Sequence, residues 1–217
     1  FLVSLAWFFA LSDVSPIWWF VSLPFQAIAI TNTVNSRMHW QSHGTIFVHP
    51  LLTRIYENVL TVATGKTFSG WTELHWIHHK ISCDKAVNGI CQDINSPYHG
   101  SLDDNRANIW KFMMMNSVAP ARRWLSIKSF CKIPKLERNH IQEQWVFKLY
   151  ILALFLVNPA YAGFHLLLMF VGYMADAAQG YGEHWMSIDK ASDQTRNATS
   201  VYNRWWNVWN FNGGHHQ

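Results

Sequence analysis

The sequence WTELHWIHHK, residues 71–80, places three histidines within five positions, and the interpretation of the whole chain depends on it. His75, His78 and His79 stand at i, i+3 and i+4, so on a helix, at about 100° per residue, their side chains project from one face. Neutral imidazole is the commonest metal ligand, and three protonated imidazoles on one face would repel one another. The spacing therefore favours a metal site over a solvated, histidine-rich helix.

The composition is typical of a membrane protein. Hydrophobic residues make up 50% of the chain, aromatic residues 16% and charged residues only 14%. The net charge is +4, and no basic run accompanies a nucleic-acid-binding motif, so we expect no nucleic-acid partner. Cys83, Cys91 and Cys131 form no CxxC pair and are predicted to be reduced thiols facing a cytosol.

The first 36 residues predict a transmembrane helical hairpin. Asp13 is the only charged residue before Arg37, and the polar residues 13–16 divide the stretch into two apolar arms. The second arm, residues 16–34, can cross a hydrocarbon core of about 30 Å at 1.5 Å per residue, with Pro16 in its first turn. Because the chain opens at Phe1, we expect the first arm to be truncated.

Residues 144–181 predict a second transmembrane hairpin. The apolar block exceeds one span, and Asn158-Pro159 divides it into two arms. Lys148 would then reach towards the water from the cytoplasmic end of the first arm. His165 lies in the second arm, where a haem would require a second histidine within a span.

The positive-inside rule orients this arrangement. Residues 37–148 hold 14 of the 17 Lys and Arg residues and contain no apolar stretch long enough to span. We therefore predict a cytosolic helical region at 37–143, and a return to the same side for the C-terminal region 182–217. The fold class is all-α: an integral membrane protein with two transmembrane hairpins and a cytosolic helical cap.

Three further segments of the cytosolic regions have specific predictions. Residues 51–64 predict an amphipathic or partly embedded helix, and Ser101 and Asp104 predict a helix N-cap. Residues 122–138 alternate basic and apolar side chains, which suits either a membrane surface or an ordinary basic helix packed on the cytosolic body.

Three further histidine groups fall on the same predicted side of the membrane. His39 and His43 lie four apart and share a helical face, His184 follows the second hairpin, and His215 and His216 stand near the end. This agreement strengthens the metal interpretation. His49 precedes Pro50, which starts a new segment, so we expect a loop residue there.

These residues resemble the membrane-bound di-iron fatty acid desaturase and hydroxylase superfamily, whose histidine boxes surround two membrane hairpins. His39 to His43 is similar to the first box, and His75 to His79 to the second. FNGGHHQ is similar to the approach to the third, with the chain ending inside that box. The resemblance implies that two irons are held by the following residues: His39, His43, His75, His78, His79, His184 and His216. Two departures stand out: Gly180 replaces an Asn that some members carry, and His215 stands where relatives often have Tyr, so it is expected beside the metal site rather than in it.

The resemblance also implies a function. We expect an O2-dependent enzyme that desaturates a lipid acyl chain, in a bacterial inner membrane or the endoplasmic reticulum, with its boxes on the cytoplasmic side. Electrons would come from an external donor, a ferredoxin or a b-type cytochrome, since no flavin or haem motif is visible. Two alternatives stay open: a hydroxylase or ketolase of an alkane, acyl chain or carotenoid on the same scaffold, and a non-catalytic membrane metal or haem protein.

Overall fold

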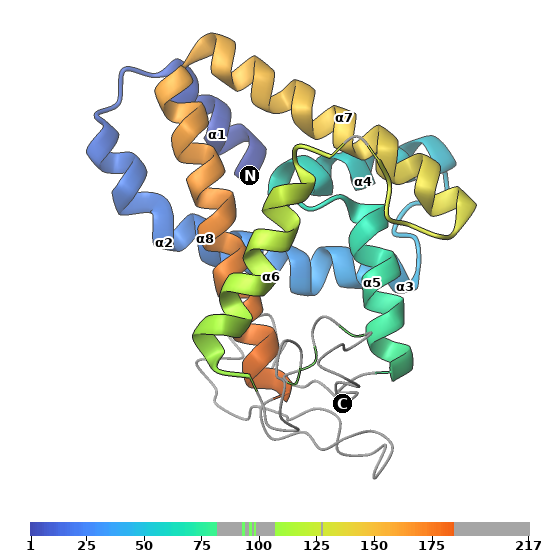
Figure 1. The fold of residues 1–217 in the computed structure, drawn as a ribbon. Helices are drawn as coiled ribbons and strands as arrows, with labels where there is room; N and C mark the ends of the chain where they lie inside the picture. The colour runs from blue at the N-terminus through green and yellow to red at the C-terminus, as the bar shows by residue number, and fades with distance from the viewer. Residues whose placement is uncertain (82–92, 94–95, 97, 99–106, 127, 185–217) are drawn as a thin grey trace. The chain divides into compact units, whose positions relative to one another are not determined.

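The structure is a computed structural model that describes residues 1–81, 93, 96, 98, 107–126 and 128–184 (Figure 1). These residues form helices and connecting loops, with no strand among them, as an all-α fold requires. The helices are α1 (Leu2–Leu11), α2 (Pro16–Asn32), the π-helical segment η1 (Thr33–Met38), α3 (His39–His43), α4 (Pro50–Thr64), α5 (Phe68–Ile81), α6 (Ile109–Arg123), α7 (Pro134–Val157) and α8 (Pro159–His184).

The helix boundaries follow the prolines that the sequence analysis singled out. α2, α4 and α8 begin at Pro16, Pro50 and Pro159, where the missing N–H and the fixed φ of proline suit a first turn. The predicted breaks near Asp13 and Asn158 are thus confirmed, as is a helix over residues 51–64.

α7 is one continuous helix of 24 residues from Pro134 to Val157, so it passes through the predicted boundary at residue 144. Its first half carries the charged side chains of Lys135, Glu137, Arg138 and Glu143, and its second half is apolar apart from Lys148. Helical hydrogen bonds join backbone groups, so the helix continues through the change in side-chain polarity. The boundary drawn from hydropathy is therefore not the end of a helix.

The chain divides into two compact units. The first comprises residues 1–72 and 120–173, and the second comprises residues 73–119 and 174–217. Each unit is described by itself below.

Apolar side chains from α1, α2, α7 and α8 form the core of the first unit. Ile30, Leu154 and Tyr161 are fully buried there. α2 and α8 approach closely because Gly172 has no side chain: a Cβ at that position would lie 2.9 Å from Cγ2 of Ile30. Thr31 adds a hydrogen bond of 3.4 Å to the backbone carbonyl oxygen of Gly172. Close packing of the two apolar helices thus depends on a small residue at the crossing.

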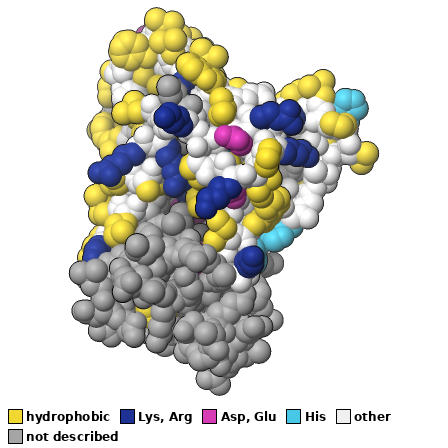
Figure 2. Space-filling view, turned by 45° about the vertical axis from the view of Figure 1, so that its right-hand side comes forward, with side chains coloured by type: hydrophobic (Ala, Val, Ile, Leu, Met, Phe, Trp, Pro, Cys, Tyr) yellow, Lys and Arg dark blue, Asp and Glu magenta, His cyan; other side chains and the backbone are white. Residues whose placement is uncertain are grey.

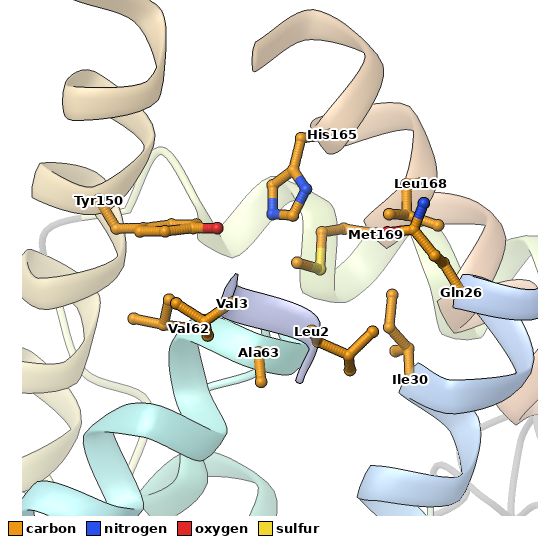
Figure 3. A pocket seen from close by; sticks show the side chains of 10 residues that line it. All are labelled: Leu2, Val3, Gln26, Ile30, Val62, Ala63, Tyr150, His165, Leu168 and Met169. Atoms are coloured by element: carbon orange, nitrogen blue, oxygen red, sulfur yellow. The ribbon is translucent and has the colours of Figure 1, made fainter. Parts of the chain in front are cut away.

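His165 lies inside this core (Figure 3). It points into a small pocket that Leu2, Val3, Gln26, Ile30, Val62, Ala63, Tyr150, Leu168 and Met169 also line, and these side chains leave no room for a water molecule. Its ring packs against Tyr150, with centroids 5.6 Å apart. His165 is the only histidine among these lining residues, so the pocket does not supply the pair of ligands that a haem between spans requires.

Within the part of the chain that the structure describes, two helical stretches are long and apolar enough to cross a membrane: Pro16–His43 and Pro159–His184. This result concerns length and composition alone, so the hairpins and their sidedness stay predictions. Large apolar side chains on α2 are nevertheless exposed: Ile17, Trp18 and Phe25 are 64%, 57% and 65% accessible. Figure 2 shows hydrophobic side chains over broad parts of one face, with Lys and Arg among them.

The second unit has a core of its own. Phe112 of α6 packs on Tyr181 of α8, with ring centroids 5.2 Å apart, and Ala107 and Ala177 are buried beside them. The hydroxyl of Tyr181 donates a hydrogen bond of 2.7 Å to the backbone carbonyl oxygen of Ala107. These contacts fix the C-terminal end of α8, where His184 lies.

The predicted basic segment 122–138 is not one helix. α6 ends at Arg123, a connecting segment follows, and α7 begins at Pro134. The guanidinium of Arg123 lies 3.9 Å from the centroid of Phe130, and Cys131 is buried, so part of this segment packs inwards. The predicted N-cap at Ser101 and Asp104 lies outside the described residues.

Candidate metal centre

α5 places the second histidine box on a regular helix, as predicted. The helix begins at Phe68, whose backbone N–H donates a hydrogen bond of 3.0 Å to the side-chain oxygen of Thr61. The next N–H, of Ser69, donates to the carboxylate of Glu143 at 2.8 Å. The first N–H groups of a helix have no partner within it, so these two contacts stabilise the first turn of α5.

His75 and His79 face each other one turn apart on α5. Their Nε2 atoms are 3.0 Å apart, and their rings stand nearly perpendicular, at 89°, with centroids separated by 4.4 Å. His75 is buried and His79 is exposed. Two nitrogens bound to one ion at about 2.1 Å each, at a right angle, would lie roughly 3 Å apart. The observed separation therefore fits two ligands of a single ion.

His78 lies on the same helix among buried polar groups. Its ring contacts that of His184, the last residue of α8, with centroids 4.7 Å apart and an interplanar angle of 75°. Its Nδ1 lies 2.8 Å from Oδ2 of Asp93. His78 and His184 are 5% and 3% accessible, so both imidazoles are withdrawn from bulk solvent in the second unit.

The first unit holds the other predicted pair. His39 and His43 form α3, directly after the π-helical segment Thr33–Met38, and their rings meet at 82° with centroids 4.8 Å apart. Each π-helical turn carries an additional residue, which changes the direction of every side chain that follows. The π-helical segment thus sets the face from which His39 and His43 project, an effect that regular helical spacing does not predict.

The donor chemistry fits a transition metal. His39 and His43 supply a pair of imidazoles in the first unit, and His75 and His79 supply a pair in the second. Neutral imidazole suits iron, copper, zinc and nickel, whereas Mg²⁺ and Ca²⁺ prefer oxygen ligands. The residues present in the structure thus agree with the nitrogen-rich ligand set that the sequence predicts.

The structure brings some of the predicted site residues together, and others lie outside the residues that it describes. His75, His78, His79 and His184 come together in the second unit, and His39 and His43 form a pair in the first. His215 and His216 lie outside the described residues. His49, as predicted, is an exposed residue that precedes a new helix.

Two buried polar residues of the structure were not predicted from the sequence. Asp93 contacts His78 across 15 positions of sequence, in a segment without helical spacing, so no pattern signals it. His140 is fully buried on α7, where its Nδ1 lies 2.8 Å from Oγ of Ser129 and its Nε2 lies 3.3 Å from the amide nitrogen of Gln144. His140 shares no helical spacing with another histidine, and its described contacts fasten α7 to the segment before it.

Comparison of the chain with models of protein families, with curated proteins and with solved structures finds no match.

Proposed function

We propose that this chain is a membrane-bound, O2-dependent oxidoreductase that introduces a double bond into a lipid acyl chain at a di-iron centre. The histidines proposed to hold the irons are His39, His43, His75, His78, His79, His184 and His216. The observation that carries the proposal is the 3.0 Å separation of the Nε2 atoms of His75 and His79. Two neutral imidazoles at this distance can share one hydrogen bond, and a shared metal ion would hold both nitrogens equally close.

The burial of three histidines in the second unit supports the same conclusion. His75, His78 and His184 are each less than 10% accessible, and burial of several imidazoles in one place is costly unless each nitrogen has a partner. A metal ion is a partner that several nitrogens can share. The bound irons would supply the activation of O2 and the removal of two hydrogens from an unactivated alkyl chain.

The protein would supply the ligands and a route for an apolar substrate. Helices Pro16–His43 and Pro159–His184 end at His43 and His184, so two proposed ligands lie at the ends of apolar stretches. Only 33% of the apolar 18-residue stretch within Pro16–His43 is buried in the structure. The core helix of a soluble protein is, by contrast, mostly buried. We propose that lipid covers the remainder, and that a cytosolic or membrane-bound donor, a ferredoxin or a b-type cytochrome, delivers electrons.

Metal analysis and lipid analysis test the proposal together. The protein purified from membranes should contain iron, at about two per chain. A host that expresses it should accumulate lipids two mass units lighter, each with a new double bond. A product sixteen mass units heavier would instead indicate the hydroxylase alternative. An active preparation that contains only zinc, or no metal, would overturn the proposal.

A further inference from the structure

We infer that Asp93 is a positioning residue of the metal site: its carboxylate holds the imidazole of His78 in the tautomer and orientation in which Nε2 is the ligand atom. The inference rests on the proposed function, because it assigns a role to a residue beside a proposed ligand. It rests also on one contact that lies wholly within the second unit, Oδ2 of Asp93 at 2.8 Å from Nδ1 of His78.

The contact has a consequence for the tautomer of His78. An ionised carboxylate only accepts hydrogen bonds, so beside ionised Asp93 the donor is Nδ1 of His78, and a neutral ring then keeps its lone pair on Nε2. A histidine that binds a metal through one ring nitrogen usually donates the other N–H to a carboxylate, a carbonyl or water. The pair formed by Asp93 and His78 has this arrangement without a metal ion.

Both groups of this contact are buried. Asp93 is 1% accessible and His78 is 5% accessible, so water cannot readily replace either group. A buried carboxylate is tolerated only where a donor satisfies it, so a purely structural role would need some donor at this place, but not a histidine. The donor here is the central histidine of three on α5, and its ring also meets that of His184 at 4.7 Å between centroids.

The backbone of Asp93 also takes part in a hydrogen bond. Its carbonyl oxygen accepts a hydrogen bond of 3.2 Å from the N–H of Ser96. The side chain of Ser96, which is fully buried, accepts a hydrogen bond of 3.3 Å from the N–H of Tyr98. These contacts connect Asp93 to Ser96 and Ser96 to Tyr98, so Asp93 is held by its backbone as well as by His78.

Titration with Co²⁺ tests the inference, because its visible absorption reports binding without any catalytic turnover. The variants are Asp93→Ala, which removes the acceptor, and Asp93→Asn, which keeps a side-chain oxygen that can accept from Nδ1–H. Asp93→Ala should weaken binding of one Co²⁺ by about ten- to a hundredfold. Asp93→Asn should restore most of the affinity and the shape of the absorption band.

Ser117→Ala is the matched control. Ser117 is fully buried in the second unit, and its hydroxyl donates to the backbone carbonyl oxygen of Met113 at 2.7 Å, away from any histidine contact. This variant should bind Co²⁺ like the wild type. A wild-type protein that binds no Co²⁺ would overturn the proposed function itself. Wild-type affinity in Asp93→Ala would overturn only the role of Asp93, and so would an equal loss in Asp93→Ala and Ser117→Ala.

Discussion

The backbone N–H of Ser69 donates a hydrogen bond of 2.8 Å to Oε2 of Glu143, so a carboxylate on α7 caps the first turn of the helix that carries His75, His78 and His79. The hydroxyl of Ser69 donates to the other carboxylate oxygen, also at 2.8 Å. A negative charge at a helix N-terminus is favourable, because it meets the unpaired N–H groups and the positive end of the helix dipole.

Arg54 completes this contact from α4. Its Nη1 lies 2.9 Å from Oε1 of Glu143, and it also pairs with Glu57 one turn along its own helix. Burial raises the pKa of the Glu143 carboxyl, although the hydrogen bonds from Ser69 and the charge of Arg54 act in the opposite direction. Ser69 of α5, Arg54 of α4 and Glu143 of α7, all in the first unit, thus meet at one buried carboxylate.

Replacement of Glu143 should therefore destabilise the protein according to what the new side chain can accept. Glu143→Leu leaves the N–H of Ser69 and the guanidinium of Arg54 without this acceptor, and should lower the free energy of unfolding by about 3 kcal/mol. Glu143→Gln keeps one oxygen and, since burial already disfavours the charge, should cost about 1 kcal/mol. Thermal unfolding followed by tryptophan fluorescence measures the difference, and equal losses would contradict this role.

Gly65 should tolerate no side chain. It ends α4 with φ of +69°, a conformation that costs a residue with a Cβ roughly 1–2 kcal/mol. A Cβ there would also lie 2.5 Å from the hydroxyl oxygen of Tyr173, which accepts a hydrogen bond from the indole of Trp124. Gly65→Ala should lower the melting temperature by several degrees.

Gly163→Ala is the control for that substitution. Gly163 lies within α8, and a Cβ there would meet no atom within 4 Å. Alanine is a better helix former than glycine by about 1 kcal/mol, so this variant should be as stable as the wild type or more stable. A melting temperature lowered equally by both substitutions would show that position 65 does not specifically require glycine.

The sequence predicted the helix boundaries at Pro16, Pro50 and Pro159 because proline acts on the backbone where it stands. It also predicted that His75, His78 and His79 share a face, because three or four residues make one helical turn. Both signals are local. The direction of His39 and His43 was less predictable, since a π-helical segment precedes them.

Contacts between distant segments could not be predicted. Glu143 is 74 residues from Ser69, and nothing in its own segment distinguishes it from Glu137, which is exposed on the same helix. Asp93 lies among turn-forming residues, where an aspartate is ordinary. Each carboxylate meets its hydrogen-bond donor only when the chain packs. The periodicity of a single sequence does not predict which distant residues pack together.

Labelling of introduced cysteines tests the predicted topology. Lys80 and Gly182 are exposed near the ends of α5 and α8, whereas Val157 is exposed at the turn between α7 and α8. In a background without native cysteines, Lys80→Cys and Gly182→Cys should react with an impermeant reagent from the cytoplasmic side, and Val157→Cys only from the opposite side. Labelling of Lys80→Cys and Gly182→Cys from different sides would refute the double hairpin.

His79→Ala compared with His49→Ala tests the metal site most directly, because both histidines are exposed and both substitutions remove one imidazole. His79 lies with its Nε2 at 3.0 Å from that of His75, whereas His49 precedes the first turn of α4. Loss of a ligand leaves the ion misplaced and an open coordination position, so His79→Ala should lower iron content and reduce product by at least about a hundredfold. His49→Ala should retain most of both at matched membrane expression. If His79→Ala kept normal iron and normal product, α5 would not carry the metal site.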